Sequence, residues 1–148
     1  MKSAVRSKDI SQPLSLVKKD IASASELINN AKKPFIFVGH GILISKAQQE
    51  IKDFSEKTGI PVASTLLGLS AFPTDHPNYV GMLGMHGNYG PNKLTNKADV
   101  IIAVGMRFDD RVTGNLDTYA KQAKVVHIDI DYAEMGKNVT PTVGMIAD

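Results

Sequence analysis

The densest group of charged side chains lies in residues 105–114, directly after the most apolar stretch of the sequence, residues 100–104. Within this segment, Arg107 and Arg111 flank two aspartates, one of which is Asp109. The planar guanidinium of arginine suits phosphate oxygens, and a neighbouring carboxylate can orient it or accept a hydrogen bond from a ribose hydroxyl. The pattern therefore favours a site for a nucleotide or its phosphates over a solvated loop with internal ion pairs.

A second candidate for phosphate binding is the sequence Gly39-His40-Gly41, which follows an apolar run and opens toward a predicted helix. Because glycine has no side chain, backbone N–H groups and the positive end of a helix dipole can approach a phosphate there. An ordinary tight turn explains the same residues equally well. Position 44 is Ile44, so the third glycine of the G-x-G-x-x-G fingerprint is absent, which counts against a standard NAD dehydrogenase.

Polar and apolar residues alternate in residues 127–131, so that His127, Asp129 and Asp131 share one face of a predicted strand. A carboxylate at the end of such a strand commonly accepts hydrogen bonds from ribose hydroxyls. The alternative is a solvent-facing strand edge in which Asp131 only caps the following turn. The residues alone leave both interpretations open.

Residues 83–87 place a soft apolar side chain, Met85, and an imidazole, His86, between two glycines. Such a pair suits the lining of a site for a flat ring. The alternative is that Gly87 or Asn88 only starts a helix. The segment is thus a candidate for ring binding, beside the two candidates for phosphate binding.

The residue types present exclude several kinds of chemistry. The chain has no cysteine, which excludes disulfides, thiolate metal ligands and a cysteine nucleophile. The histidines have neither the spacing of metal ligands nor a convincing serine and acid partner. We therefore expect this chain to contain no catalytic residue and no metal-binding residue.

Charge and hydropathy also limit the partners. Seventeen Lys and Arg against fifteen Asp and Glu leave a net charge of +2, which is too small and too dispersed for a nucleic-acid surface. The longest wholly apolar run without glycine, residues 100–104, is far shorter than the ~20 residues of a membrane span. Since the N-terminus also lacks a secretory signal pattern, we expect a cytoplasmic protein without a nucleic-acid or membrane partner.

The candidate segments follow short apolar runs that predict buried strands, at residues 34–38, 60–64, 79–82, 100–104, 124–130 and 143–146. Helical patterns precede or separate them, at residues 13–30, 43–59, 88–97 and 132–135. The alternation predicts a three-layer, doubly wound α/β fold with a six-stranded, mainly parallel sheet, Rossmann-like in the order 3-2-1-4-5-6. We expect one domain at residues 13–148, preceded by an interdomain linker at residues 1–12. Ligands of such sheets bind beyond the carboxyl ends of the strands, where the candidate segments lie.

Four segments, in this order along the chain, resemble acetolactate synthase, also called acetohydroxyacid synthase: residues 63–69, 83–87, 105–114 and 127–131. The resemblance extends over roughly residues 33–148. It implies a catalytic subunit of three domains, of which this chain is the middle one. The middle domain holds FAD across the carboxyl edge of its sheet, while the absent outer domains hold thiamine diphosphate and magnesium.

The resemblance also implies a reaction and partners. The family condenses two pyruvates, or pyruvate and 2-oxobutyrate, after decarboxylation, in branched-chain amino-acid biosynthesis, and its flavin has a structural role in that reaction. The family's Gly-Asp-Gly metal motif and catalytic glutamate have no counterpart here, so we expect the isolated chain to be inactive. The implied partners are the parent's own N- and C-terminal domains, a second copy in a homodimer or tetramer, and a small regulatory subunit.

The resemblance assigns FAD contacts residue by residue. The assigned residues are Gly39, His40, Gly41, Thr65, Leu66, Gly84, Met85, His86, Gly105, Arg107, Asp109, Arg111, Val112, Asp129, Ile130 and Asp148. Gly84 to His86 would lie near the flavin, Gly105 to Val112 along the ribityl and phosphate part, and Asp129 toward the adenosine end. The sequence departs from the family at His40 and Ala147, where many members have glycine.

Three other functions fit parts of the pattern. The first is the middle domain of another thiamine diphosphate enzyme, of the pyruvate oxidase or decarboxylase type, some of which bind ADP or nothing in that domain. The second is a free-standing nucleotide-binding sensor, which would bind ADP or NAD tightly by itself. The third is a structural spacer without affinity for a cofactor.

Overall fold

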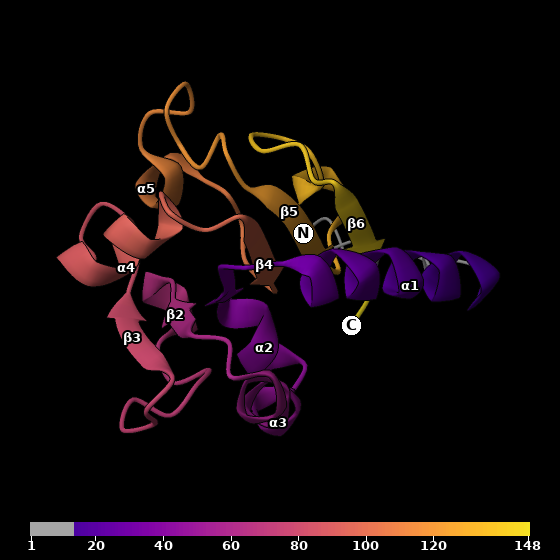
Figure 1. Cartoon of the computed structure of the whole chain (residues 1–148), viewed down its shortest axis with the longest axis horizontal. Coiled ribbons are helices and arrows are strands. Elements are labelled where there is room, and N and C mark those ends of the chain that lie inside the picture. The colour runs from indigo at the N-terminus through magenta and orange to yellow at the C-terminus, as the bar shows by residue number, and fades with distance from the viewer. Residues whose placement is uncertain (1–13) are drawn as a thin grey trace, which may run out of the picture.

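Six parallel strands form one sheet at the centre of the structure, a computed structural model that describes residues 14–148 (Figure 1). The strands are β1 (Pro34–Val38), β2 (Val62–Ser64), β3 (Tyr79–Met82), β4 (Val100–Val104), β5 (Lys124–Asp129) and β6 (Val143–Ile146). Their order is β3-β2-β1-β4-β5-β6, and every neighbouring pair is parallel. The predicted fold class and strand order are therefore confirmed. The predicted linker at residues 1–12 lies outside the described residues.

Helices and short helical turns connect the strands. They are α1 (Leu14–Asn30), α2 (His40–Ile44), α3 (Gln48–Thr58), η1 (Leu66–Gly68), α4 (Tyr89–Thr95), α5 (Asp110–Thr113) and η2 (Tyr132–Glu134). The prediction of one helix over residues 43–59 is wrong at its start, because α2 begins at His40 and a break at Lys46, with a φ of 58°, separates it from α3. The predicted end is confirmed, since Gly59 has a φ of 70° and donates its N–H to the Ser55 carbonyl.

Apolar residues of alternating orientation cover both faces of the sheet. In β1, Ile36 and Val38 pack in a core cluster with residues of α1, α2 and α3. Phe35 and Phe37 point to the other face, where their rings meet at 5.0 Å with a T-shaped geometry. There they join Phe108 and other residues of the segments that follow β3 and β4. The sheet thus forms the middle of three layers, as the sequence predicted.

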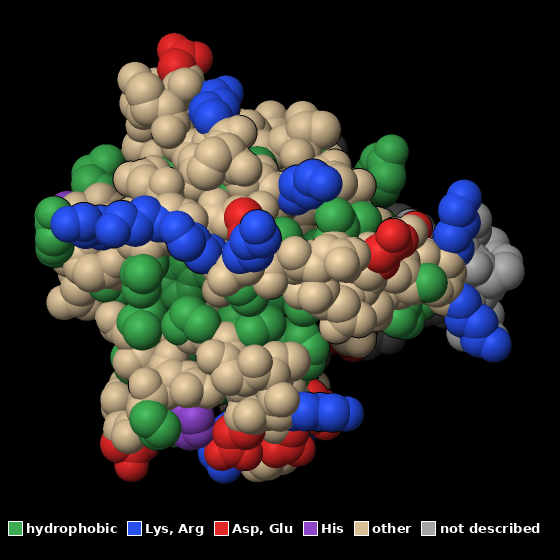
Figure 2. Space-filling model, viewed as in Figure 1, with side chains coloured by type: hydrophobic (Ala, Val, Ile, Leu, Met, Phe, Trp, Pro, Cys, Tyr) green, Lys and Arg blue, Asp and Glu red, His purple; other side chains and the backbone are tan. Residues whose placement is uncertain are grey.

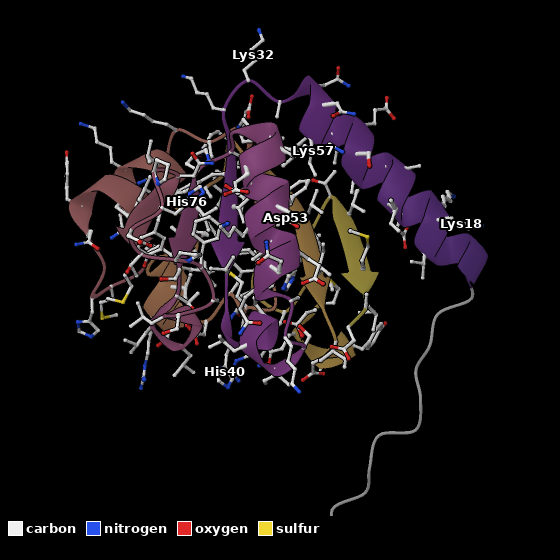
Figure 3. The ribbon with its side chains drawn as sticks, turned by 90° about the horizontal axis from the view of Figure 1, so that it is seen from below. Lys18, Lys32, His40, Asp53, Lys57 and His76 are labelled. Atoms are coloured by element: carbon white, nitrogen blue, oxygen red, sulfur yellow. The ribbon has the colours of Figure 1, made fainter. Side chains whose placement is uncertain are left out.

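The strand order reverses between β1 and β4, which lie side by side. The chain leaves β1 through α2 and β4 through α5, and these helices pack on opposite faces, Ile42 in one core cluster and Val112 against the other. Doubly wound proteins bind their ligands at such a point. Figure 3 shows Lys32, just before β1, at one edge of the sheet and His40, just after β1, at the opposite, carboxyl edge.

Helix α1 extends past β6 and projects beyond the sheet, with Lys18 near its far end (Figures 1 and 3). Its C-terminal half anchors it, because Ala24 is buried and Ile28 packs against the core, while Ile21 is 51% exposed. In Figure 2, basic side chains are spread over the face from this end of α1 to the opposite side, with acidic side chains between them. Among residues 14–148, no helix has both the length and the apolar composition that crossing a membrane requires.

A carboxylate ties the loop between α1 and β1 to the start of β4. Asp99 accepts the backbone N–H groups of Lys32, at 2.7 Å, and Lys33, at 2.9 Å. Burial raises the pKa of Asp99, but the hydrogen bonds from backbone N–H groups outweigh it, so this pKa lies below the ordinary value for aspartate. A group whose pKa is depressed on folding stabilises the fold above its unfolded pKa, and this contribution is lost as the pH falls through the folded pKa.

We expect Asp99→Asn to lower the free energy of unfolding at pH 7 by about 1 kcal/mol, because asparagine cannot offer two charged acceptor oxygens. As the pH falls below about 4 toward the depressed pKa of Asp99 in the folded protein, the carboxylate takes up a proton and the difference should shrink. Urea unfolding at pH 7 and at pH 3 measures both effects. Asp117→Asn is the matched control, because the Asp117 side chain makes no hydrogen bond with another described residue. The same difference at both pH values would contradict the role given to the Asp99 charge.

The hydroxyl of Tyr119 is buried near Phe108 without a hydrogen-bond partner among the described residues. Burial raises the pKa of Tyr119, so the phenol stays neutral. A buried hydroxyl without a partner destabilises the fold, because it has given up its bond to water. We therefore expect Tyr119→Phe to raise the free energy of unfolding, measured with urea, by about 1 kcal/mol. A clear loss of stability would show that the hydroxyl has a partner after all.

Candidate functional site

The backbone that follows β1 touches the backbone that follows β4. Gly39 donates its N–H to the Val104 carbonyl at 3.0 Å, and Gly41 donates its N–H to the Gly105 carbonyl at 2.8 Å. A Cβ atom on Gly39 would lie 2.2 Å from the Gly105 oxygen, and one on Gly41 would lie 2.6 Å from the Gly105 Cα. These two N–H groups therefore hold the sheet edge together, so the tight-turn interpretation describes Gly39 and Gly41 better than a phosphate cradle.

The turn η1 after β2 rests on this junction. Thr65 donates its N–H to the Val38 carbonyl at 3.0 Å, and its hydroxyl accepts the N–H of Gly68 at 3.1 Å. The ring Nδ1 of His40 lies 3.1 Å from the carbonyl oxygen of Leu67. Because η1 is held at both ends, Leu66 can remain 57% exposed at the carboxyl edge. The structure thus brings the predicted residues Thr65 and Leu66 next to His40.

The segment after β4 presents both arginines to the outside. Asp109 caps α5, where its Oδ1 accepts the N–H of Val112 at 3.2 Å, and Phe108 is buried below. Arg107 and Arg111 are exposed. Neither guanidinium forms a salt bridge or a hydrogen bond with another residue in the range 14–148. The alternative of a loop with internal ion pairs therefore does not apply, and both guanidinium groups are free to bind an anion.

Residues at the end of β5 support this segment from below. His127 is fully buried, its Nε2 donates to the Met106 carbonyl at 2.9 Å, and its ring meets Phe108 edge-on at 5.1 Å. Asp129 is only 8% exposed, and its Oδ1 accepts the N–H of Asp131 at 2.9 Å. The solvent-facing alternative is therefore wrong for His127 and Asp129. Asp131 does cap the following turn, as that alternative held, since its Oδ1 accepts the N–H of Ala133 at 2.9 Å.

The loop after β3 contacts the segment after β4. Met85 donates its N–H to the Arg111 carbonyl at 2.7 Å, and its side chain is 64% exposed. His86 is exposed and makes no side-chain hydrogen bond with the described residues. Asn88 stands at the N-cap position of α4 without a side-chain capping hydrogen bond, so the helix-start alternative holds for that residue. The loop thus presents Met85 and His86 beside α5.

The predicted residues all lie in segments at the carboxyl edge of the sheet, and these segments contact one another in pairs. The loop of Met85 contacts α5. The turn η1 contacts the turn after β1 at His40. The Gly105 N–H donates to the Ile128 carbonyl at 2.8 Å, which joins the ends of β4 and β5. The Ala147 N–H donates to the Asp129 carbonyl at 3.2 Å, so Asp148 follows at the β6 end, exposed and without a side-chain hydrogen bond in the described part.

Residues 21–148 match the family described as "Thiamine pyrophosphate enzyme, central domain". The chain belongs to this family. The match covers every strand of the sheet and all the segments at its carboxyl edge. The resemblance that the motifs carried is therefore confirmed at the level of the central-domain family.

The chain is also similar to curated acetolactate synthases. It is 52% identical to acetolactate synthase 2, chloroplastic, of Nicotiana tabacum over 122 residues, which is 82% of this chain and 18% of the relative. It is 46% identical to the acetolactate synthase of Mycobacterium leprae over 130 residues, 88% of this chain and 21% of the relative. A probable acetolactate synthase large subunit of Methanocaldococcus jannaschii is 43% identical over 141 residues, 95% of this chain and 23% of the relative. The chain thus spans about a fifth of the length of these relatives.

Three residues that position the edge of this central domain were not predicted as site residues. Gly68 allows η1 to approach β1, because a Cβ there would lie 2.3 Å from the Val38 oxygen. Asn138 donates from Nδ2 to the Phe108 carbonyl at 2.7 Å and so ties the loop before β6 to the arginine segment. Asn92 binds the backbone of Gly84. Gly68 lies in a motif segment and could have been found, whereas the asparagines carry no signal in the sequence.

Proposed function

We propose that residues 13–148 are the flavin-binding central domain of an acetolactate synthase large subunit, and that residues 1–12 link it to a preceding domain. The observation that carries this proposal is the 52% identity to a tobacco acetolactate synthase over 122 residues, which is 82% of this chain. Identity at this level over most of the chain favours acetolactate synthase over pyruvate oxidase, a decarboxylase or a free-standing sensor.

The groups at the carboxyl edge fit the parts of FAD. The guanidinium groups of Arg107 and Arg111 are exposed and free to bind the diphosphate. Asp129 has one carboxylate oxygen bound to the Asp131 N–H, and its other oxygen, 4.0 Å from the His127 Nε2, is the one proposed to accept from a ribose hydroxyl. Exposed apolar side chains at the same edge can cover the flat rings. They are Leu66, Met85 and Ile130, exposed by 57%, 64% and 66%.

Other assigned residues act through the backbone. Asp109 fixes the start of α5 and thereby the direction of the Arg111 side chain. Gly39, Gly41 and Gly105 let the turns after β1 and β4 come together, and this contact sets the shape of the surface on which the cofactor would lie. The proposed FAD site therefore includes Asp109 and the three glycines. It also includes His40, Thr65, Gly84, His86, Val112 and Asp148.

The bound flavin is proposed to shape the site, while the condensation of two pyruvates, or of pyruvate and 2-oxobutyrate, takes place at thiamine diphosphate and magnesium in other domains. The matched part covers only 18% and 21% of these relatives, which fits such additional domains. A homodimer or tetramer and a small regulatory subunit belong to the same proposal. The cytoplasmic location stays a prediction, and two similar proteins are named chloroplastic.

The test is an assay of acetolactate formation from pyruvate by the full-length protein that contains this segment, with thiamine diphosphate, magnesium and FAD. We expect product that disappears when thiamine diphosphate is omitted. The 148-residue chain alone should form none. Release of acetaldehyde or acetate in place of acetolactate would contradict the proposal and indicate another thiamine diphosphate enzyme.

A further inference from the structure

One side chain holds the backbone of the loop after β3 at two points. The amide of Asn92, in α4, accepts the N–H of Gly84 through Oδ1 at 2.9 Å and donates from Nδ2 to the Gly84 carbonyl at 2.9 Å. Gly84 is buried and has a φ of +101°, a conformation that only glycine adopts easily. The asparagine thus satisfies the N–H of this buried glycine and is the second donor to its carbonyl, which also accepts the N–H of Gly87 at 2.9 Å.

The loop held in this way lies directly on the arginine segment. The neighbouring Met85 donates its N–H to the Arg111 carbonyl at 2.7 Å. A Cβ on Gly84 would lie 2.8 Å from the same carbonyl oxygen and 3.5 Å from the Val112 Cα, so the two backbones are in close contact. The position of Gly84 therefore sets the relative position of the Met85 and Arg111 side chains, both of which are exposed at the carboxyl edge.

We infer that Asn92 is a positioning residue for the cofactor site, which aligns the ring-binding loop at Met85 with the phosphate-binding segment at Arg111. This inference rests on the proposed flavin site. Asn92 acts through the Gly84 backbone, and it lies in a helix that no site motif includes. An amide side chain suits this role, because its oxygen can accept the N–H of Gly84 while its NH₂ group donates to the Gly84 carbonyl.

Two substitutions separate the two halves of this contact. Asn92→Ala removes both hydrogen bonds: it leaves the buried N–H of Gly84 without a partner, while the Gly84 carbonyl keeps only the N–H of Gly87. Asn92→Asp keeps the size of the side chain and the acceptor for the Gly84 N–H, but it turns a second oxygen toward the Gly84 carbonyl. Asn96→Ala is the matched control, because Asn96 ends the same helix one turn later and its side chain makes no hydrogen bond with a described residue.

The experiment uses the full-length protein and titrates it with FAD, monitored by flavin fluorescence. We expect the FAD dissociation constant to rise about fivefold to tenfold in Asn92→Ala and in Asn92→Asp, the factor that the loss of one or two ordinary hydrogen bonds produces. The visible circular dichroism of the flavin at saturating FAD should also change, because the groups around the rings are shifted. Asn96→Ala should match the wild type in both measurements.

The outcomes separate the inference from the function on which it rests. Wild-type affinity and an unchanged flavin dichroism spectrum in Asn92→Ala would overturn the role of Asn92 and leave the flavin site intact. If Asn92→Ala does not fold, the same two readouts on Asn92→Asp decide. A wild-type protein that binds no FAD would instead overturn the proposed function, and the inference with it.

Discussion

Replacing Gly105 with alanine is expected to lower the free energy of unfolding by about 3 to 5 kcal/mol. Gly105 has a φ of +59°, which strains any residue with a side chain. In addition, its Cβ would lie 2.7 Å from the Gly41 Cα and 2.8 Å from the Ile42 nitrogen. Both neighbours are backbone atoms, so the turns after β1 and β4 would have to separate at the switch point of the sheet.

Urea unfolding of the 148-residue chain measures this effect, and Gly59→Ala is the matched control. Gly59 has a similar φ of +70°, but a Cβ there would meet nothing within 4 Å. We expect Gly59→Ala to destabilise the fold by only about 1 kcal/mol, because it introduces the strain of a positive φ without a steric overlap. The difference between the two variants then measures the overlap at Gly105. Equal losses in the two variants would show that the contact between the two turns is not tight.

Arg107→Ala is expected to weaken FAD binding by the full-length protein by about 1.5 to 3 kcal/mol, or roughly 10-fold to 150-fold. The guanidinium is exposed and has no ion-pair partner among residues 14–148, so its charge is available to the diphosphate. For the same reason, the substitution should leave the free energy of unfolding without FAD almost unchanged.

Arg107→Lys is the control for charge alone, because lysine keeps the positive charge but lacks the planar fork that binds two oxygens. We expect its FAD dissociation constant to lie between those of the wild type and Arg107→Ala. Equilibrium dialysis with FAD gives all three values. If FAD binds equally well to the wild type and Arg107→Ala, Arg107 does not contact the diphosphate.

Much of the fold could be predicted from the sequence, because each buried parallel strand is a short apolar run between turn residues. The strand at residues 143–146 was predicted with the observed bounds, and β2 begins at Val62 rather than Ile60 because Pro61 has no N–H for the ladder. The break between α2 and α3 was missed. It depends on a positive φ at Lys46, a residue type that gives no sign of such a conformation.

The candidate site could be located from the sequence, but the role of each residue could not. The motifs predicted which segments reach the carboxyl edge, since that follows from the strand order. They did not show that Gly39 and Gly41 pack against Gly105, because this contact depends on how closely two turns distant in sequence approach each other. The role of Asn92 was hidden for the same reason.

We propose that this chain holds FAD within an acetolactate synthase, and a titration of the full-length wild-type protein with FAD tests this most directly. Quenching of flavin fluorescence reports the bound fraction. We predict saturable binding with one FAD per chain. A titration that shows no saturable binding, in a folded full-length protein, would contradict the claim.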